Sequence, residues 1–305
     1  MNWPVRIGIN PISWMNDDLP SLGGETPLEK ALAEGREIGY EGFELGNKFP
    51  KTGPALEAKL AEFGVVCVSG WYSGHLAEGT VADEIVRCRE HLEKLKYNDV
   101  QVLVYGEVAG SIQGQIDTPL SRRPRFADDA AWKAYASRLD DFGAHVAATY
   151  GIRLAYHHHM GAYVESPQDI DRLRSLTDPA KVGLLFDTGH AWYGGASDPV
   201  ALLKKHLPRV IHVHCKDVRP NVIAKARNEG WSFLKGVING TFTMPGDGVI
   251  DFDAVLRTLH GGGYRGWLVV EAEQDPAVAP SYEFGVKGYR TLRSIIDRID
   301  SGAVR

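Results

Sequence analysis

The chain has 305 residues, of which 44% are hydrophobic and 24% charged, a balance typical of a folded globular protein and not of a disordered or fibrous chain. Its 34 Lys and Arg against 39 Asp and Glu give a formal net charge of −5, which argues against nucleic-acid binding. No apolar run reaches the roughly 18 residues of a membrane span. The three cysteines form no Cys-x-x-Cys pair, so we expect free thiols in a reducing, cytoplasmic compartment.

Short apolar runs rich in β-branched residues alternate with longer amphipathic stretches throughout the chain. The runs expected to form strands are residues 5–12, 42–46, 65–71, 100–105, 152–157, 182–187, 210–214 and 267–271. The stretches expected to form helices are residues 26–38, 54–63, 81–95, 128–149, 167–176, 199–206, 252–260 and 282–299. Two of these helices open with a capping residue followed by proline, Ser166-Pro167 and Asp198-Pro199, which is typical of a helix start.

The predicted strands are continuous apolar runs, as expected for parallel strands that are buried on both faces. Eight strands that each precede a helix predict a (β/α)₈ TIM barrel, an α/β fold. A doubly wound open sheet is the alternative, because alternation alone does not show closure. No linker divides the chain, so we expect a single domain over residues 1–305. Two long irregular stretches, residues 106–126 and 218–248, follow strands and are expected at the catalytic face.

Imidazoles and carboxylates are concentrated at the ends of predicted strands five to eight. In a barrel these ends surround one mouth, where such enzymes place their active sites. A single histidine at a strand end is more often structural, but four such ends together favour a site for a divalent transition metal. The residues are His157, His158 and His159 on strand five, Asp187 and His190 on strand six, His212 and His214 on strand seven, and Glu271 and Glu273 on strand eight.

Polar and aromatic residues also follow the first three predicted strands. Such side chains at a barrel mouth suit a pocket for a sugar-like ring, although packing beneath loops explains each aromatic residue equally well. The candidate substrate contacts are Trp14 and Asp17 after strand one, Glu44, Asn47 and Lys48 after strand two, His75 after strand three, and Lys216 after strand seven. Lys216 is also compatible with an ordinary ion pair.

Two long motifs resemble those of the inosose dehydratases of inositol catabolism. They are GINPISWMNDDLP at residues 8–20 and GFELGNKFP at residues 42–50. These dehydratases belong to the sugar isomerase/epimerase-like, or xylose isomerase-like, superfamily of metal-dependent TIM barrels. The pattern of that superfamily covers essentially the whole chain, so the resemblance implies a metal-dependent barrel enzyme that acts on a polyol or keto-sugar.

The resemblance also implies a ligand set. The superfamily binds its metal through Glu, Asp, His and Glu on strands five to eight, and Asp187, His214 and Glu271 match the last three. His157 stands where the sugar epimerases have Glu, as it does in the Tyr-His-x-His of the dehydratases. The missing carboxylate argues against epimerisation by two carboxylate bases. His190 matches a histidine that the superfamily places near the metal and substrate.

The reaction implied by the resemblance is the loss of water from 2-keto-myo-inositol (scyllo-inosose) to a trihydroxycyclohexane-1,2-dione. Mn²⁺ or Co²⁺ would polarise the ketone, and loss of the α-proton would give a metal-bound enediolate. A general acid would then protonate the departing hydroxyl. The residues leave the assignment open: the candidate bases are Glu271, His157 and His159, and the candidate acids are His190, Glu44 and His75.

The nearest alternative is a keto-sugar isomerase or epimerase of the same superfamily, which would form the same enediolate but retain the hydroxyl. A phosphoester hydrolase of the endonuclease IV kind would need more metal ions and a basic surface. A polyol-binding regulator would be expected to have a damaged ligand set. The resemblance further implies glutathione as an accessory cofactor, and barrels of this class often form homo-oligomers.

Overall fold

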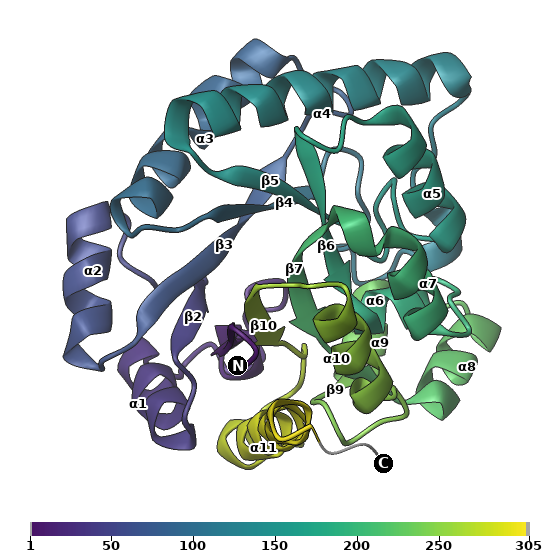
Figure 1. Ribbon diagram of the computed structural model, residues 1–305. Helices are drawn as coiled ribbons and strands as arrows, with labels where there is room; N and C mark the ends of the chain where they lie inside the picture. Colours follow the sequence, from purple (N-terminus) through teal and green to yellow (C-terminus); the bar gives the residue numbers. More distant parts are fainter. Residues whose placement is uncertain (1, 303–305) are drawn as a thin grey trace.

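Eight parallel strands close into a barrel in the computed structural model, which describes residues 2–302 (Figure 1). The strands are β1 (Val5–Ile9), β2 (Gly42–Leu45), β3 (Val66–Gly74), β4 (Val102–Glu107), β5 (Arg153–His157), β6 (Val182–Asp187), β7 (Val210–Cys215) and β10 (Gly266–Val270). Strand β1 pairs with β2 on one side and with β10 on the other, which closes the sheet. The predicted TIM barrel is therefore confirmed, and the open sheet is excluded.

Helices surround the barrel and cover the outer face of its strands (Figure 1). The eight main helices are α1 (Leu28–Ile38), α2 (Gly53–Glu62), α3 (Val81–Tyr97), α4 (Asp129–Tyr150), α5 (Pro167–Leu176), α7 (Pro199–His206), α10 (Phe252–Gly261) and α11 (Ser281–Asp300). Helix α5 begins with a capping box, in which the side chains of Ser166 and Asp169 each accept a hydrogen bond from the other's backbone N–H. No helix within residues 2–302 is long and apolar enough to cross a membrane.

Two strand boundaries differ from the expected ones for clear local reasons. The first strand was expected to continue to residue 12, but β1 ends at Ile9 and a 3₁₀ turn, η1 (Pro11–Ser13), follows. Pro11 has no N–H to donate to a neighbouring strand, and the Asn10 side chain accepts from the Ile12 N–H to start the turn. Strand β3 continues beyond residue 71 to Gly74, because it goes on pairing with β4.

The expectation that residues 218–248 are irregular is wrong. They contain α8 (Pro220–Asn228) and α9 (Phe233–Ile238), and Val218 and Phe242–Thr243 contribute to the antiparallel pair β8 (Asp217–Val218) and β9 (Phe242–Thr243). Apolar side chains from this segment form a second core with the loop after β5 and the helix α6 (Thr188–Tyr193). The short helices were missed because each is only two or three turns long. The stretch at residues 106–126 is largely irregular, as expected, with one 3₁₀ turn, η2 (Leu120–Arg122).

The barrel interior is filled below the catalytic face by a small apolar layer. Val104, Ala155 and Leu185 are buried together there, and the half-buried Trp71 packs against them. The Trp71 ring lies edge-on to His157 and His159, with ring centroids 5.4 and 5.7 Å apart. The ring thus connects the core of the barrel to the strand ends above it.

Adding a methyl group at Gly106 is expected to disturb this connection. A Cβ atom there would lie 2.0 Å from the Trp71 ring. We expect Gly106→Ala to lower the free energy of unfolding by about 1–3 kcal/mol, measured by urea denaturation, because the ring must move within a packed interior. Gly114→Ala is the matched control, since a Cβ at Gly114 meets nothing within 4 Å, and its effect should stay within about 0.5 kcal/mol. Equal effects of the two changes would contradict the prediction.

Candidate active site

A cavity of about 370 Å³ opens at the carboxyl ends of the strands. Its wall includes Glu44 from β2, Trp71 from β3, His157 from β5 and His214 from β7, with Glu271 directly after β10. A barrel brings these ends to one mouth although they are far apart in the sequence. The cavity is large enough for a single sugar-sized ring, within the usual range for small-molecule sites.

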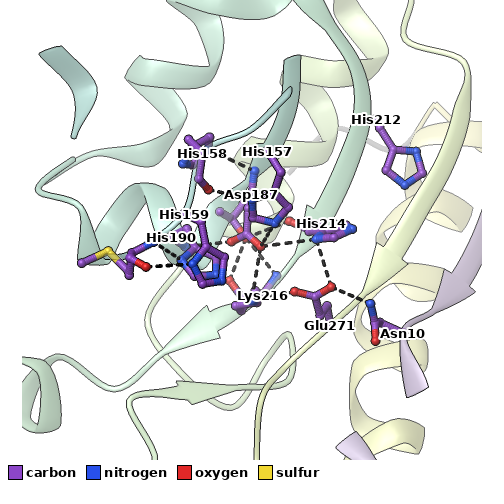
Figure 2. A network of polar contacts seen from close by, with 12 residues as sticks. Asn10, His157, His158, His159, Asp187, His190, His212, His214, Lys216 and Glu271 are labelled. Carbon is purple, nitrogen blue, oxygen red and sulfur yellow. Dashed lines mark hydrogen bonds and ion pairs between the residues drawn. The ribbon is translucent and has the colours of Figure 1, made fainter. Parts of the chain in front are cut away.

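Four buried side chains point ligand atoms at one another beside this cavity (Figure 2). One ligand atom from each of His157, Asp187, His214 and Glu271 lies within 4.8 Å of the others. The Asp187 Oδ2 is 3.6 Å from the His157 Nε2 and 3.5 Å from the His214 Nδ1, which is itself 3.1 Å from the Glu271 Oε2. These are the four residues expected as metal ligands, and the structure brings them together.

The donor set fits a divalent cation. Two of its atoms, the Asp187 Oδ2 and the His214 Nδ1, are buried and make no hydrogen bond within the described residues. Burial opposes the ionisation of Glu44, Asp187 and Glu271, but neighbouring cationic side chains outweigh it and lower the pKa of each carboxyl. With a neutral His214, the Lys216 ammonium, which contacts Asp187 and Glu271, is the one cation that the described residues place beside these three carboxylates, so two negative charges are left uncompensated. Two imidazoles and two carboxylates are ligands that suit a divalent transition metal.

The protonation of His214 supports the same conclusion. Burial alone would lower the pKa of this imidazole, but the carboxylates of Glu271 and Glu44 overcome that effect and raise the pKa well above its usual value. In the absence of a metal ion, the site therefore draws a proton onto His214. A bound cation would take the place of that proton, because only the neutral imidazole is a ligand.

Hydrogen bonds behind the four ligands fix their orientation. The His157 Nδ1 contacts the carbonyl oxygen of His158 at 2.7 Å, so Nδ1 carries the proton and Nε2 presents its lone pair. The Glu44 carboxylate lies 3.1 Å from the His214 Nε2 and 2.8 Å from the His212 Nε2. Asn10 donates to both Glu44 and Glu271, at 3.0 and 2.9 Å. Carboxylate–histidine contacts of this kind are typical of metal sites.

His159, His190 and Glu273 form a second buried group next to the first. The main chain of Met160 sets opposite tautomers on the two imidazoles. Its carbonyl lies 2.8 Å from the His159 Nδ1, which must donate, so the His159 Nε2 keeps its lone pair. Its N–H donates to the His190 Nδ1 at 3.2 Å, so in the neutral ring the His190 Nε2 carries the proton. Burial lowers the pKa of both imidazoles, to about 4 for His159, and keeps them neutral.

Lys216 lies between the two groups, not in the cavity wall. Its ammonium contacts Glu271 at 2.7 Å, Glu273 at 2.8 Å and Asp187 at 3.4 Å, and the residue is fully buried. Burial alone would lower its pKa, but the three carboxylates raise it, so the ammonium stays charged. The side chain expected to contact substrate is therefore placed to hold two glutamates in position.

The other expected substrate contacts divide into two sets. Glu44, Asp17 and Asn47 line the cavity, and the Asp17 Oδ2 accepts from the Asn47 N–H at 2.8 Å. Three do not line it. Trp14 is buried in the core and donates to Glu34, Lys48 bonds to the carbonyls of Gly24 and Thr26, and the His75 Nδ1 contacts the Ser73 carbonyl.

Several residues of the cavity wall, among them Asn10, Asp18 and Lys51, were not among the candidate site residues. Asn10 was assigned to the interior of the first strand, and only the strand's early end at Ile9 places it at the mouth. Asp18 lines the cavity beside Asp17, and the sequence contains no signal that distinguishes the two neighbours.

Comparison with known proteins agrees with the barrel fold. A family model for the xylose isomerase-like TIM barrel matches residues 32–294. The rhizopine catabolism protein MocC of Rhizobium meliloti is 45% identical over 94% of this chain and 87% of its own length. An inosose dehydratase of Klebsiella pneumoniae is 43% identical over 95% of this chain and 97% of its own. The solved structure of an L-ribulose 3-epimerase superposes with a TM-score of 0.66 at 15% identity, covering 99% of both chains.

The chain therefore belongs to the xylose isomerase-like TIM barrel family. Within this family it is similar, over nearly its full length, to inosose dehydratases of several bacteria at 39–43% identity.

Replacing the carboxylate behind His214 is expected to weaken metal binding. Glu44→Gln removes the charge that contacts the His214 Nε2, and loss of such an outer contact typically costs 10–100-fold in affinity. Titration calorimetry with Mn²⁺ should show a dissociation constant raised by about that factor. His260→Ala is the control, because His260 packs on Trp3 away from the site, and its affinity should match the wild type. An unchanged affinity in Glu44→Gln would refute this role of Glu44.

Proposed function

We propose that this protein is an inosose dehydratase, which removes water from 2-keto-myo-inositol to give a trihydroxycyclohexane-1,2-dione. The observation that carries the proposal is the buried group of His157, Asp187, His214 and Glu271 at a ring-sized cavity. The near full-length similarity to inosose dehydratases supports the choice of substrate. The similarity to MocC, which is named as a protein of rhizopine catabolism, supports a catabolic role for this protein.

The four-residue group would hold Mn²⁺ or Co²⁺. Either ion, when bound, supplies a Lewis acid for the ketone and a neighbouring hydroxyl and so makes the α-proton more acidic. Two neutral imidazoles with two carboxylates suit both ions, and the described residues place no thiolate among the ligands. The His157 Nε2 and the His214 Nδ1 would be the nitrogen ligands, because their other nitrogens contact a carbonyl and a carboxylate.

His159 is the base that the arrangement favours for the α-proton. It lines the cavity, and its contact with the Met160 carbonyl leaves the lone pair of Nε2 free. The other two candidate bases, Glu271 and His157, belong to the metal group. The centroids of the His190 and His159 rings are 4.0 Å apart, and the His190 Nε2 lies 3.6 Å from Glu273. His190 therefore packs against the base and helps to position it.

The position of His157 favours dehydration over isomerisation. The sugar epimerases have a Glu at this position as one of their two acid/base groups, and His157 supplies no carboxylate there. We also place the enzyme in the cytoplasm, which is supported by its three buried free cysteines. Glutathione and a homo-oligomeric state remain part of the proposal on the ground of the family resemblance.

The test is direct. Metal-stripped protein is incubated with 2-keto-myo-inositol, with and without Mn²⁺ or Co²⁺ and with and without glutathione, and the dione is followed by its ultraviolet absorbance. We expect metal-dependent dione formation that falls about 10²–10³-fold in His214→Ala and Glu271→Ala, because several kcal/mol of charge stabilisation are lost. His260→Ala should retain the wild-type rate.

Two other results would redirect the assignment. Entry of solvent deuterium at the α-carbon without any dione would replace the dehydratase with a keto-sugar isomerase. If metal-loaded protein gives neither dione nor deuterium exchange, both reactions are excluded on this substrate.

A further inference from the structure

The proposed reaction needs an acid for the departing hydroxyl, and the residues expected to supply it are not free to do so. Both oxygens of Glu44 are occupied by His212, His214 and Asn10. The rings of His75 and His190 lie outside the cavity wall.

One carboxyl group of the cavity wall has no partner. Five carboxylates line the cavity: those of Asp17, Asp18, Glu44, Glu271 and Glu273. Four of them accept hydrogen bonds or form ion pairs with the protein. The fifth is Asp18, which lines the cavity and whose side chain makes no hydrogen bond or ion pair within residues 2–302. A carboxyl group that lines the cavity and has no protein partner is available to contact a bound substrate.

The backbone around Asp18 is fixed on both sides. The buried Asn16 side chain accepts from the N–H groups of Asp18 and Leu19, each at 2.9 Å. Asp17 is tied to Asn47 in the loop after β2, and Leu19 packs against the apolar cluster that contains α8 and α9. The Asp18 carboxyl is therefore held at the cavity between two anchored neighbours, although it bonds to neither.

The electrostatic surroundings favour a proton on this carboxyl. Burial raises the pKa of Asp18 to about 6; the Lys216 ammonium opposes the shift, and the carboxylates of Asp17 and Glu271 reinforce it. This places the group close to the working range of a general acid near neutral pH.

We propose that Asp18 is the general acid of the dehydration, on the basis of its free, cavity-facing carboxyl; the inference rests on the proposed function. When the base takes the α-proton, the electron pair of that C–H bond passes to the ketone oxygen and leaves an enolate. The enolate then returns its electron pair, so that a double bond forms between the α- and β-carbons and the bond from the β-carbon to its hydroxyl breaks. Asp18 gives its proton to the departing oxygen, so water leaves and the carboxylate remains. The enol tautomerises to the dione, and protons exchanged with solvent restore the acid and the base.

Substrates with different leaving groups separate proton donation from binding. Asp18→Asn keeps the size of the side chain but cannot donate an acidic proton. We expect its rate of dione formation to fall about 10²–10³-fold, in line with the usual contribution of a general acid. Exchange of the α-proton with deuterated solvent should continue within a few-fold of wild type. An analogue with fluorine in place of the β-hydroxyl needs no protonation, so fluoride release should also stay within about tenfold.

Glu25→Gln is the matched control, because Glu25 lies exposed in the same loop and outside the cavity wall. It removes the same charge and should leave all three rates unchanged. Thermal melting of metal-loaded Asp18→Asn should show no loss of stability, since no protein contact is removed. Asp18→Ala provides a second variant, in which added formate should restore part of the dehydration.

The outcomes are distinct. A wild-type rate of dione formation in Asp18→Asn, or a parallel loss of dehydration, exchange and fluoride release in a folded variant, would overturn the role of Asp18 as the acid. Failure of the wild-type enzyme itself to exchange the α-proton or form the dione would instead overturn the proposed function.

Discussion

The structure depends on a surplus of buried negative charge at the mouth of the barrel. Glu44, Asp187 and Glu271 are nearly inaccessible to water, yet within the described chain the Lys216 ammonium contacts only two of them, and even a proton on His214 leaves one of the three charges uncompensated. A folded protein can maintain such a surplus only if the rest of the molecule is stable enough to enforce it. The barrel provides that stability through a large apolar core between strands and helices. The charge of a divalent cation then converts an unfavourable arrangement into a favourable one.

The closed sheet also determines how the charges meet. Asp187 and His214 are direct partners in the register between β6 and β7, so their side chains emerge at the same height. His157 follows on β5, and Glu271 comes directly after β10 on the other side of β7. Four residues from separate parts of the chain therefore become neighbours without any specialised loop. The loops are left to supply contacts that differ between members of the family, which is how one barrel supports several reactions.

The fold and the ligand group could be predicted because both follow from short-range patterns. Apolar runs of strand length recur eight times, and each of the four ligands ends or directly follows such a run. The loop residues depend on partners distant in the sequence. Trp14 turns inward to reach Glu34, and the Asn47 N–H pairs with Asp17 and leaves Asp18 without a partner. No local pattern encodes those contacts, and the same limitation hid the helices α8 and α9, whose apolar faces pack mainly on each other and on Leu19, Met160 and Tyr193.

The main chain of Met160, and not its side chain, sets the proton positions of two imidazoles in the site. Its single N–H and single C=O direct the protons of His190 and His159 to opposite ring nitrogens. The Met160 side chain points into the apolar cluster and takes no part. Any apolar residue that preserves the local backbone would serve equally well at this position. A family member can therefore keep both proton assignments while this residue changes, and a rotation of either peptide plane beside Met160 would alter the assignment of one imidazole in an otherwise unaltered sequence.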